Sequence, residues 1–341
     1  MIGSAWAQAH VDDDLAGLLH AAHRAAGDPA ASLALADRAM AVLPLPGRGR
    51  TLELWRGLAE LAAVDLTVVR ALEPHLDAQA ILAQAAEEGY AVPDASGVWG
   101  VFAAEGADPR LELRDGRLTG RKPWCSLAGL LDKALVTAWV SPHERGLVAV
   151  DLHQPGVRAV EEPWVARGLR SVQSTALDLH DVPGVPVGPP NWYLTRGGFA
   201  WGGLGVAAVW FGGAAGLARR MWAAAQERDP DQVGLALLGA VDAALTGAGA
   251  TLAEAAAAVD QGLVRGEHAW PRCVRTRHVV HDACETVLAA VAHGLGPAPL
   301  VGEEEHAARV ADLQLYLRQH KAERDAAVVG RAVADGMPTA W

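Results

Sequence analysis

The hydrophobic period of this chain changes twice, and this limits the folds that it can adopt. Residues 1–93 carry apolar side chains at helical spacing. Residues 94–190 alternate apolar and polar positions and contain turn dipeptides such as Asp115-Gly116. Residues 191–341 return to helical spacing and are rich in alanine. We therefore expect an α+β chain with an N-terminal all-α domain (1–93), a middle antiparallel β-barrel or sandwich domain (94–190) and a C-terminal helical bundle (191–341).

One helical segment is apolar enough to cross a membrane. Gly197 to Ala218 contains no charged residue. Its many glycines favour instead a buried helix in a bundle, because small residues let neighbouring helices approach closely. We expect no membrane insertion. Further along, glycines at 247–249 and 262–266 predict helix breaks, and a last helix is expected from about Glu303 towards Asp335.

Charge and cysteine content narrow the functional class. The 341 residues carry a net charge of −11, which argues against binding to nucleic acid. The three cysteines are odd in number and unpatterned, so we expect a reducing, cytoplasmic environment. The N-terminus shows no basic region followed by an apolar core, and we expect no signal peptide.

The run Gly120-Arg121-Lys122-Pro123-Trp124-Cys125-Ser126 is the most informative motif. It follows the hairpin predicted at Asp115-Gly116 and precedes a strand-like run at 134–140. A planar, electron-poor ring needs an aromatic or apolar wall and a hydrogen-bond donor at its reactive nitrogen. Trp124 and Ser126 supply these two groups. The alternative is a core tryptophan with a serine at a strand end.

The order of further segments strengthens this interpretation. The run is followed by Gly168-Leu169-Arg170-Ser171, Leu177-Asp178-Leu179-His180-Asp181-Val182, Val185-Pro186-Val187-Gly188 and a small-residue helix at 205–219. From about Thr51 to about Gly330, this order resembles the acyl-CoA dehydrogenase family. The resemblance implies FAD bound between the β-domain and the C-terminal bundle, and a homodimer or tetramer. The N-terminal helical region is shorter than the family's first domain.

The resemblance also implies which residues hold the cofactor: Phe102, Ala104, Trp124, Cys125, Ser126, Arg275, Arg277, Gly294 and Gly296. The family's diphosphate-binding loop corresponds to residues 226–232, where its aromatic-glycine pair is missing. Arg275 and Arg277 are candidates to replace it, since a diphosphate favours paired guanidinium donors. Gly294 and Gly296 resemble the family's glycine-rich turn against the adenosine half.

The family's usual catalytic base, a glutamate in a Y-E-G-T sequence, is missing from this chain. Matching Asp312 to the family's preceding helix puts the base position at His320, whereas matching Tyr316 to the motif's tyrosine puts it at Leu317. We prefer His320, because that alignment needs no gap and a histidine titrates near neutral pH. A hydrogen-bonded histidine in a packed bundle is the alternative. Two carboxylates on earlier helices, Glu254 and Glu285, are further candidates for the base.

Helical spacing supports an inward-facing His320. It shares one helical face with three apolar residues, Val310, Leu313 and Leu317. His278 and His281 with Asp282 have ligand-type side chains, but no residues clearly complete a metal site, so no metal is expected.

These observations predict an FAD-dependent oxidoreductase acting on CH–CH groups of a small-molecule acyl substrate, as a CoA or carrier-protein thioester. One alternative is a flavin-dependent monooxygenase or oxidase on the same fold. The other is a catalytically inactive relative that serves as a binding or assembly subunit, which the missing glutamate favours.

Overall fold

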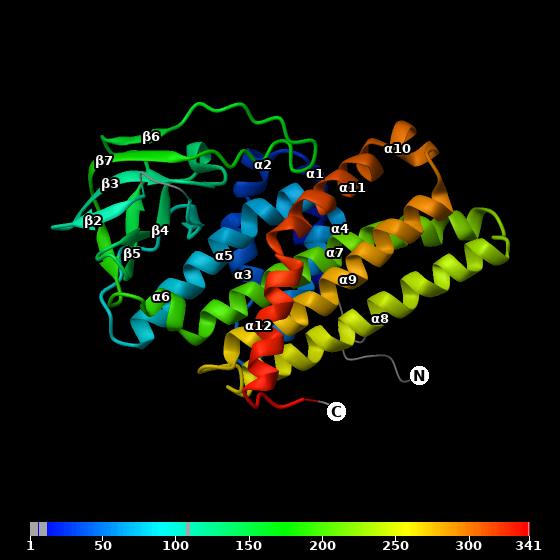
Figure 1. Ribbon diagram of the computed structural model, residues 1–341. Helices are drawn as coiled ribbons and strands as arrows, with labels where there is room; N and C mark the ends of the chain where they lie inside the picture. Colours follow the sequence, from blue (N-terminus) through cyan, green and yellow to red (C-terminus); the bar gives the residue numbers. More distant parts are fainter. Residues whose placement is uncertain (1–5, 7–11, 107–109, 340) are drawn as a thin grey trace.

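The structure, a computed structural model, describes residue 6 and residues 12–106, 110–339 and 341 (Figure 1). Its N-terminal part is helical and comprises α1 (Asp13–Arg24), α2 (Pro29–Leu33), α3 (Ala36–Val42), α4 (Thr51–Val64) and α5 (Leu66–Glu87). Aspartates begin several of these helices: the Asp12 carboxylate accepts the Leu15 N–H, and the Asp65 carboxylate accepts the Val68 N–H.

The middle part is a curled mixed sheet, in the order β6-β7-β3-β2-β4-β5-β8 with β1 beside β4. The strands are β1 (Trp99–Phe102), β2 (Glu112–Arg114), β3 (Arg117–Lys122), β4 (Lys133–Trp139), β5 (Arg145–Asp151), β6 (Val157–Ala159), β7 (Leu177–Pro183) and β8 (Val185–Val187). Most pairs are antiparallel, as predicted, but β4 pairs in parallel with both β1 and β2. Asp115 and Gly116 join β2 to β3 with positive φ angles of 49° and 75°, which confirms the predicted hairpin turn.

The C-terminal part is a bundle around the long helices α7 (Gly197–Glu227), α8 (Gln232–Asp260) and α9 (Ala269–Leu295). The short helix α6 (Trp192–Thr195) connects it to the sheet, and α10 (Ala298–Gly302), α11 (Glu304–Tyr316) and α12 (Ala322–Ala334) complete it. In Figure 1 the sheet lies at one end of the molecule, and α5 and α7 extend from it into the bundle.

The glycines of α7 allow close helix packing. A Cβ atom added at Gly212 would lie 2.1 Å from the backbone oxygen of Ala59 in α4. In the most apolar 18-residue stretch of α7, 72% is buried, so this helix belongs to the core. By length and composition α8 could also cross a membrane, but only 17% of its most apolar 18-residue stretch is buried. One apolar side of α8 therefore remains open in this single chain.

Two helix predictions were wrong. The helix α8 continues through residues 247–249, since its hydrogen-bonded turns on both sides outweigh the modest cost of glycine in a helix. The last predicted helix is interrupted: α11 ends at Tyr316, a short 3-10 turn (Leu317–Gln319) follows, and His320 is extended. The Asp325 carboxylate then accepts the Lys321 N–H at 3.0 Å, which starts α12 as a separate helix.

Candidate functional site

Ser126 lies where the sheet region meets the N-terminal helices. Its Oγ is 2.7 Å from the Ser174 hydroxyl and accepts a hydrogen bond from Nη2 of Arg70 in α5, at 3.2 Å. Trp124, two residues earlier, has a positive φ of 59° and a side chain that is 61% exposed. Cys125 between them is buried. The run thus presents an open indole and a hydroxyl on either side of a buried thiol.

An ion pair between Lys122 of β3 and the more exposed Glu105 lies just after the end of β1. Lys122 is only 1% exposed, and its Nζ donates to Glu105 and to the Thr137 hydroxyl, both at 2.8 Å. Burial alone would raise the pKa of Glu105, but hydrogen bonds and charge from Lys122 and Arg145 bring it below its ordinary value. Phe102 is packed in the core, whereas Ala104 is exposed beside this ion pair.

Three charged residues form a polar face on α5: Arg70, Glu73 and Asp77. Their steps of three and four place them on one side of the helix. An Nη1 of Arg70 lies 3.7 Å from Oε2 of Glu73, whose side chain is only 13% exposed. Burial raises the pKa of Glu73 to about 7, and the nearby charge of Asp77 adds to this, whereas Arg70 and Arg277 oppose it.

Cations and phenols from other elements surround this polar face. On α9, the guanidinium of Arg277 lies 4.3 Å from the Trp210 ring centre and donates to the Gly203 carbonyl. Arg196, which precedes α7, lies 4.0 Å from Asp77. The ring of Tyr316 lies 5.6 Å from the Arg70 guanidinium, and its buried hydroxyl has no hydrogen-bond partner within the described part of the chain.

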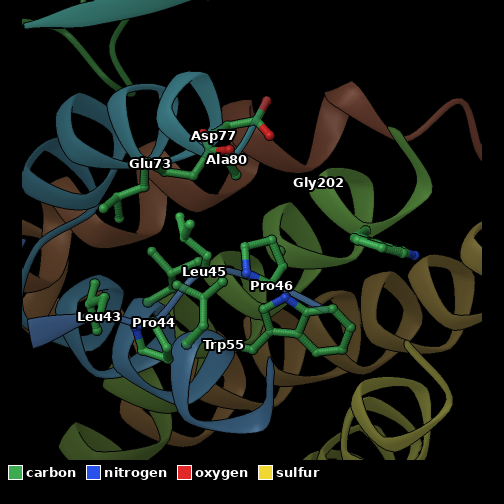
Figure 2. Close-up of a pocket in the computed structure, with 14 residues that line it drawn as sticks. Leu43, Pro44, Leu45, Pro46, Trp55, Glu73, Asp77, Ala80 and Gly202 are labelled. Atoms are coloured by element: carbon green, nitrogen blue, oxygen red, sulfur yellow. The ribbon is translucent and has the colours of Figure 1, made fainter. Parts of the chain in front are cut away.

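Beside the polar face is a small cavity between α4, α5 and α7, with a volume of about 40 Å³. Figure 2 shows Glu73 and Asp77 on one side of it and the loop residues Leu45 and Pro46, with Trp55, on the other. Trp201 forms a further wall and is held by a hydrogen bond from its Nε1 to the Val264 carbonyl. The cavity therefore combines apolar walls with two carboxylates.

The fold has clear relatives among solved structures. KijD3, solved with FMN and dTDP-3-amino-2,3,6-trideoxy-4-keto-3-methyl-D-glucose, is similar with a TM-score of 0.81 and 18% identity over 99% of this chain and 97% of that one. Butyryl-CoA dehydrogenase from Megasphaera elsdenii is similar with a TM-score of 0.78 and 16% identity over 96% of this chain and 100% of that one. The chain has the acyl-CoA dehydrogenase fold.

The acyl-CoA dehydrogenase fold also includes dibenzothiophene monooxygenase (TdsC) from Paenibacillus sp. A11-2, which is similar with a TM-score of 0.76 and 16% identity over 96% of this chain and 97% of that one. Neither a protein-family model nor a curated protein sequence matches the chain. At these identities, the similarity establishes the fold alone.

The remaining predicted cofactor residues lie on α9: Arg275, Arg277 and Gly294 within the helix and Gly296 directly after it. Arg275 donates to the Pro338 carbonyl near the C-terminus, whereas Arg277 points to α7. Gly294 and Gly296 lie at the end of α9 next to α10, away from the sheet (Figure 1).

His320 is buried in a cluster of histidines, although it follows a 3-10 turn and is not part of the helix from which its inward position was predicted. Its Nε2 is 3.1 Å from Nδ1 of His278, and its Nδ1 is 3.0 Å from a carboxylate oxygen of Asp325. Burial, with the nearby charge of His281, lowers the pKa of His320 to about 4. Within the described ranges no group of three His, Cys, Asp or Glu side chains could hold a metal ion.

The sequence analysis did not identify the polar face of α5. The available signal was a set of three charged residues at helical spacing in the first half of α5: Arg70, Glu73 and Asp77. The two other predicted base candidates have different surroundings. Glu285 forms an ion pair with Arg318, and Glu254 lies on α8.

Proposed function

We propose that this chain is a flavin-dependent oxidoreductase, with the flavin ring against Trp124 and Ser126. The observation that carries the proposal is the arrangement around Ser126: its hydroxyl faces Arg70, and beyond Arg70 lies the unpartnered, buried phenol of Tyr316. Buried polar groups are rarely left unpaired, so a ligand with acceptor atoms fits there. FMN in the named complexes of KijD3 and TdsC supports a flavin.

Such a cofactor would supply a two-electron acceptor. The residues of this chain then have separate tasks. Trp124 covers a ring face, Ser126 donates a hydrogen bond to the ring edge, and Arg70 and Arg277 supply positive charge. The apolar cavity holds the reacting part of a small acyl compound, as a CoA or carrier-protein thioester, and excludes water from it.

FAD is the cofactor predicted from the sequence, and it requires a second copy of the chain. In that arrangement Arg275, Gly294 and Gly296 of one copy reach the diphosphate and adenosine of the flavin in another. The apolar open side of α8 supports assembly into a homodimer or tetramer, since an exposed apolar surface of this kind marks an interaction site. FMN needs no such contribution from a neighbour.

A monooxygenase or oxidase is the second candidate function. The stretch that replaces the family's glutamate motif, residues 316–321, contains no carboxylate, and the similarity to TdsC favours oxygen chemistry. An inactive relative that acts as an assembly subunit is the third.

The visible spectrum of the purified protein tests the proposal. Bands of oxidised flavin, or their appearance after addition of FAD or FMN to the colourless protein, are the expected result. Release of the flavin by acid and its chromatographic identification then separates FAD from FMN. A protein that takes up neither flavin would refute the oxidoreductase and leave the inactive relative.

A further inference from the structure

We propose that Glu73 is the side chain that takes the proton from a short acyl substrate bound in the cavity between α4, α5 and α7. The proposal rests on the proposed function, because the reaction needs the bound flavin as electron acceptor. It assigns the base to the N-terminal helices, whereas the sequence prediction placed it at His320.

The position of Glu73 is the first argument. Its carboxylate borders the cavity, and on the same helix it is 3.7 Å from the guanidinium that binds Ser126. Glu73 thus stands between the apolar cavity and the hydroxyl proposed at the flavin edge. A general base must lie within reach of the substrate carbon, and a side chain that lines the cavity meets this requirement.

The charges around Glu73 are the second argument. The groups that face it are Asp77 and Arg70 on α5, Arg277 on α9, Tyr193 on α6 and Tyr316 at the end of α11. Asp77 is itself 4.0 Å from Arg196, whose charge favours its ionised form. Burial nevertheless raises the pKa of Asp77, and Arg196 only partly offsets this. For Glu73, burial is the main cause of the raised pKa, which leaves this carboxyl able to exchange a proton near neutral pH.

The contacts of His320 are the third argument. They are with His278 and His281 on α9, with Trp210 on α7 and with Asp325 on α12. None of these partners borders the cavity. The Trp210 ring contacts both Tyr316 and His320, so Tyr316 is the residue of this segment that contacts the polar face of α5.

The cavity limits the substrate. Its volume of about 40 Å³ accommodates about three water-sized groups, so the acyl chain at the reacting carbons is short. In the proposed step, a Glu73 oxygen takes the proton from the carbon next to the acyl carbonyl. The electron pair left there forms the C=C bond as the next carbon gives up a hydride, and a bound flavin would accept this hydride with its two electrons.

Three variants test the assignment: Glu73→Gln, Glu73→Asp and His320→Gln. The control is Glu87→Gln, which makes the same chemical change on the same helix at an exposed residue. The probe is butyryl-CoA in deuterated water, and the readouts are deuterium incorporation next to the carbonyl and bleaching of the flavin spectrum. We expect Glu73→Gln to keep its flavin but to slow both by about 10²–10⁴-fold, the usual contribution of a general base. Glu73→Asp should recover part of the loss, and Glu87→Gln should match the wild type.

A second measurement does not depend on turnover. In protein labelled with ¹³C at the glutamate carboxyl carbons, one signal should titrate near pH 7 and disappear in Glu73→Gln. A protein without flavin would refute the proposed function. A flavin-containing wild type without deuterium exchange, a full loss in His320→Gln with an active Glu73→Gln, or the absence of the titrating signal would each overturn the role of Glu73.

Discussion

The guanidinium of Arg70 donates a hydrogen bond to the hydroxyl of Ser126, with 3.2 Å between Nη2 and Oγ. This bond joins α5 to the segment after β3, which are 56 residues apart in the sequence. Ser126 was a candidate from the sequence motif, whereas Arg70 was not. The bond therefore adds a helix to the candidate site that the sequence analysis had not included.

The flavin wall gives the first prediction. The double variant Trp124→Ala with Ser126→Ala removes the aromatic face and the hydroxyl proposed to hold the ring. We expect a lower flavin occupancy and a weaker affinity for added flavin, measured by absorbance and by titration of the apoprotein. Since Trp124 is 61% exposed, the fold should be unaffected.

Trp222→Ala is the matched control, because Trp222 is also an exposed tryptophan, at 58%, but lies on α7 next to α8. It should leave flavin content unchanged. Equal flavin content and an identical spectrum in the double variant and the wild type would contradict the proposed position of the ring.

The second prediction concerns the contact of α4 with α7. Gly212→Ala places a methyl group against the Ala59 backbone oxygen, so the two helices must separate. We expect a loss of about 1–3 kcal/mol in the free energy of unfolding, measured by urea denaturation. Gly239→Ala on α8 has open space around the new methyl and should instead add about 1 kcal/mol. A Gly212→Ala protein as stable as the wild type would show that this approach of the helices is not tight.

The sequence predicted the order of helical and strand regions because hydrophobic period depends on local neighbours. It also predicted the turn at Asp115-Gly116, since both positions need positive φ angles. It failed at the interruption before α12, where the Asp325 carboxylate accepts the N–H of Lys321, four residues earlier. The apolar spacing of Leu313 and Leu317 continues through this interruption and therefore does not show it.

The candidate site divides in the same way. Trp124 and Ser126 lie within one short motif, so the sequence identified them. The polar face of α5 is recognised as part of the candidate site only through its contacts with Ser126, Arg277 and Tyr316, which lie on other elements. Burial raises the pKa of Glu73 and lowers the pKa of His320. This burial is likewise a property of the folded chain and not of the local sequence.

The third prediction uses the pH dependence of stability. The pKa of Glu73 rises from an ordinary 4.5 to about 7 on folding, so between these values the folded state binds more protons than the unfolded state. Stability from this residue is therefore present at low pH and is lost as the pH rises through that window. The full effect is on the order of 3 kcal/mol.

Glu73→Gln is always neutral and lacks this dependence. The free energy of unfolding of Glu73→Gln minus that of the wild type should be larger at pH 8 than at pH 5, as measured by urea denaturation at both values. Glu87→Gln, the exposed control, should follow the wild type at both. A constant difference between Glu73→Gln and the wild type would mean that Glu73 titrates normally in the folded protein.

The last prediction concerns His320 and has the opposite sign. Its pKa falls from 6.5 to about 4 on folding, first because of burial and then because of the charge of His281. Between these values the unfolded state binds more protons, so stability is lost as the pH falls from 6.5 towards 4. His320→Gln should remove this acid sensitivity, so that its free energy of unfolding minus that of the wild type is larger at pH 4.5 than at pH 7.

The same variant also tests the sequence-based assignment of the base. If His320 is the base, turnover should be lost in His320→Gln and wild-type activity should follow a group near pH 4, the pKa of His320 in the folded chain. A buried structural histidine predicts instead that turnover is retained and that only the acid stability changes.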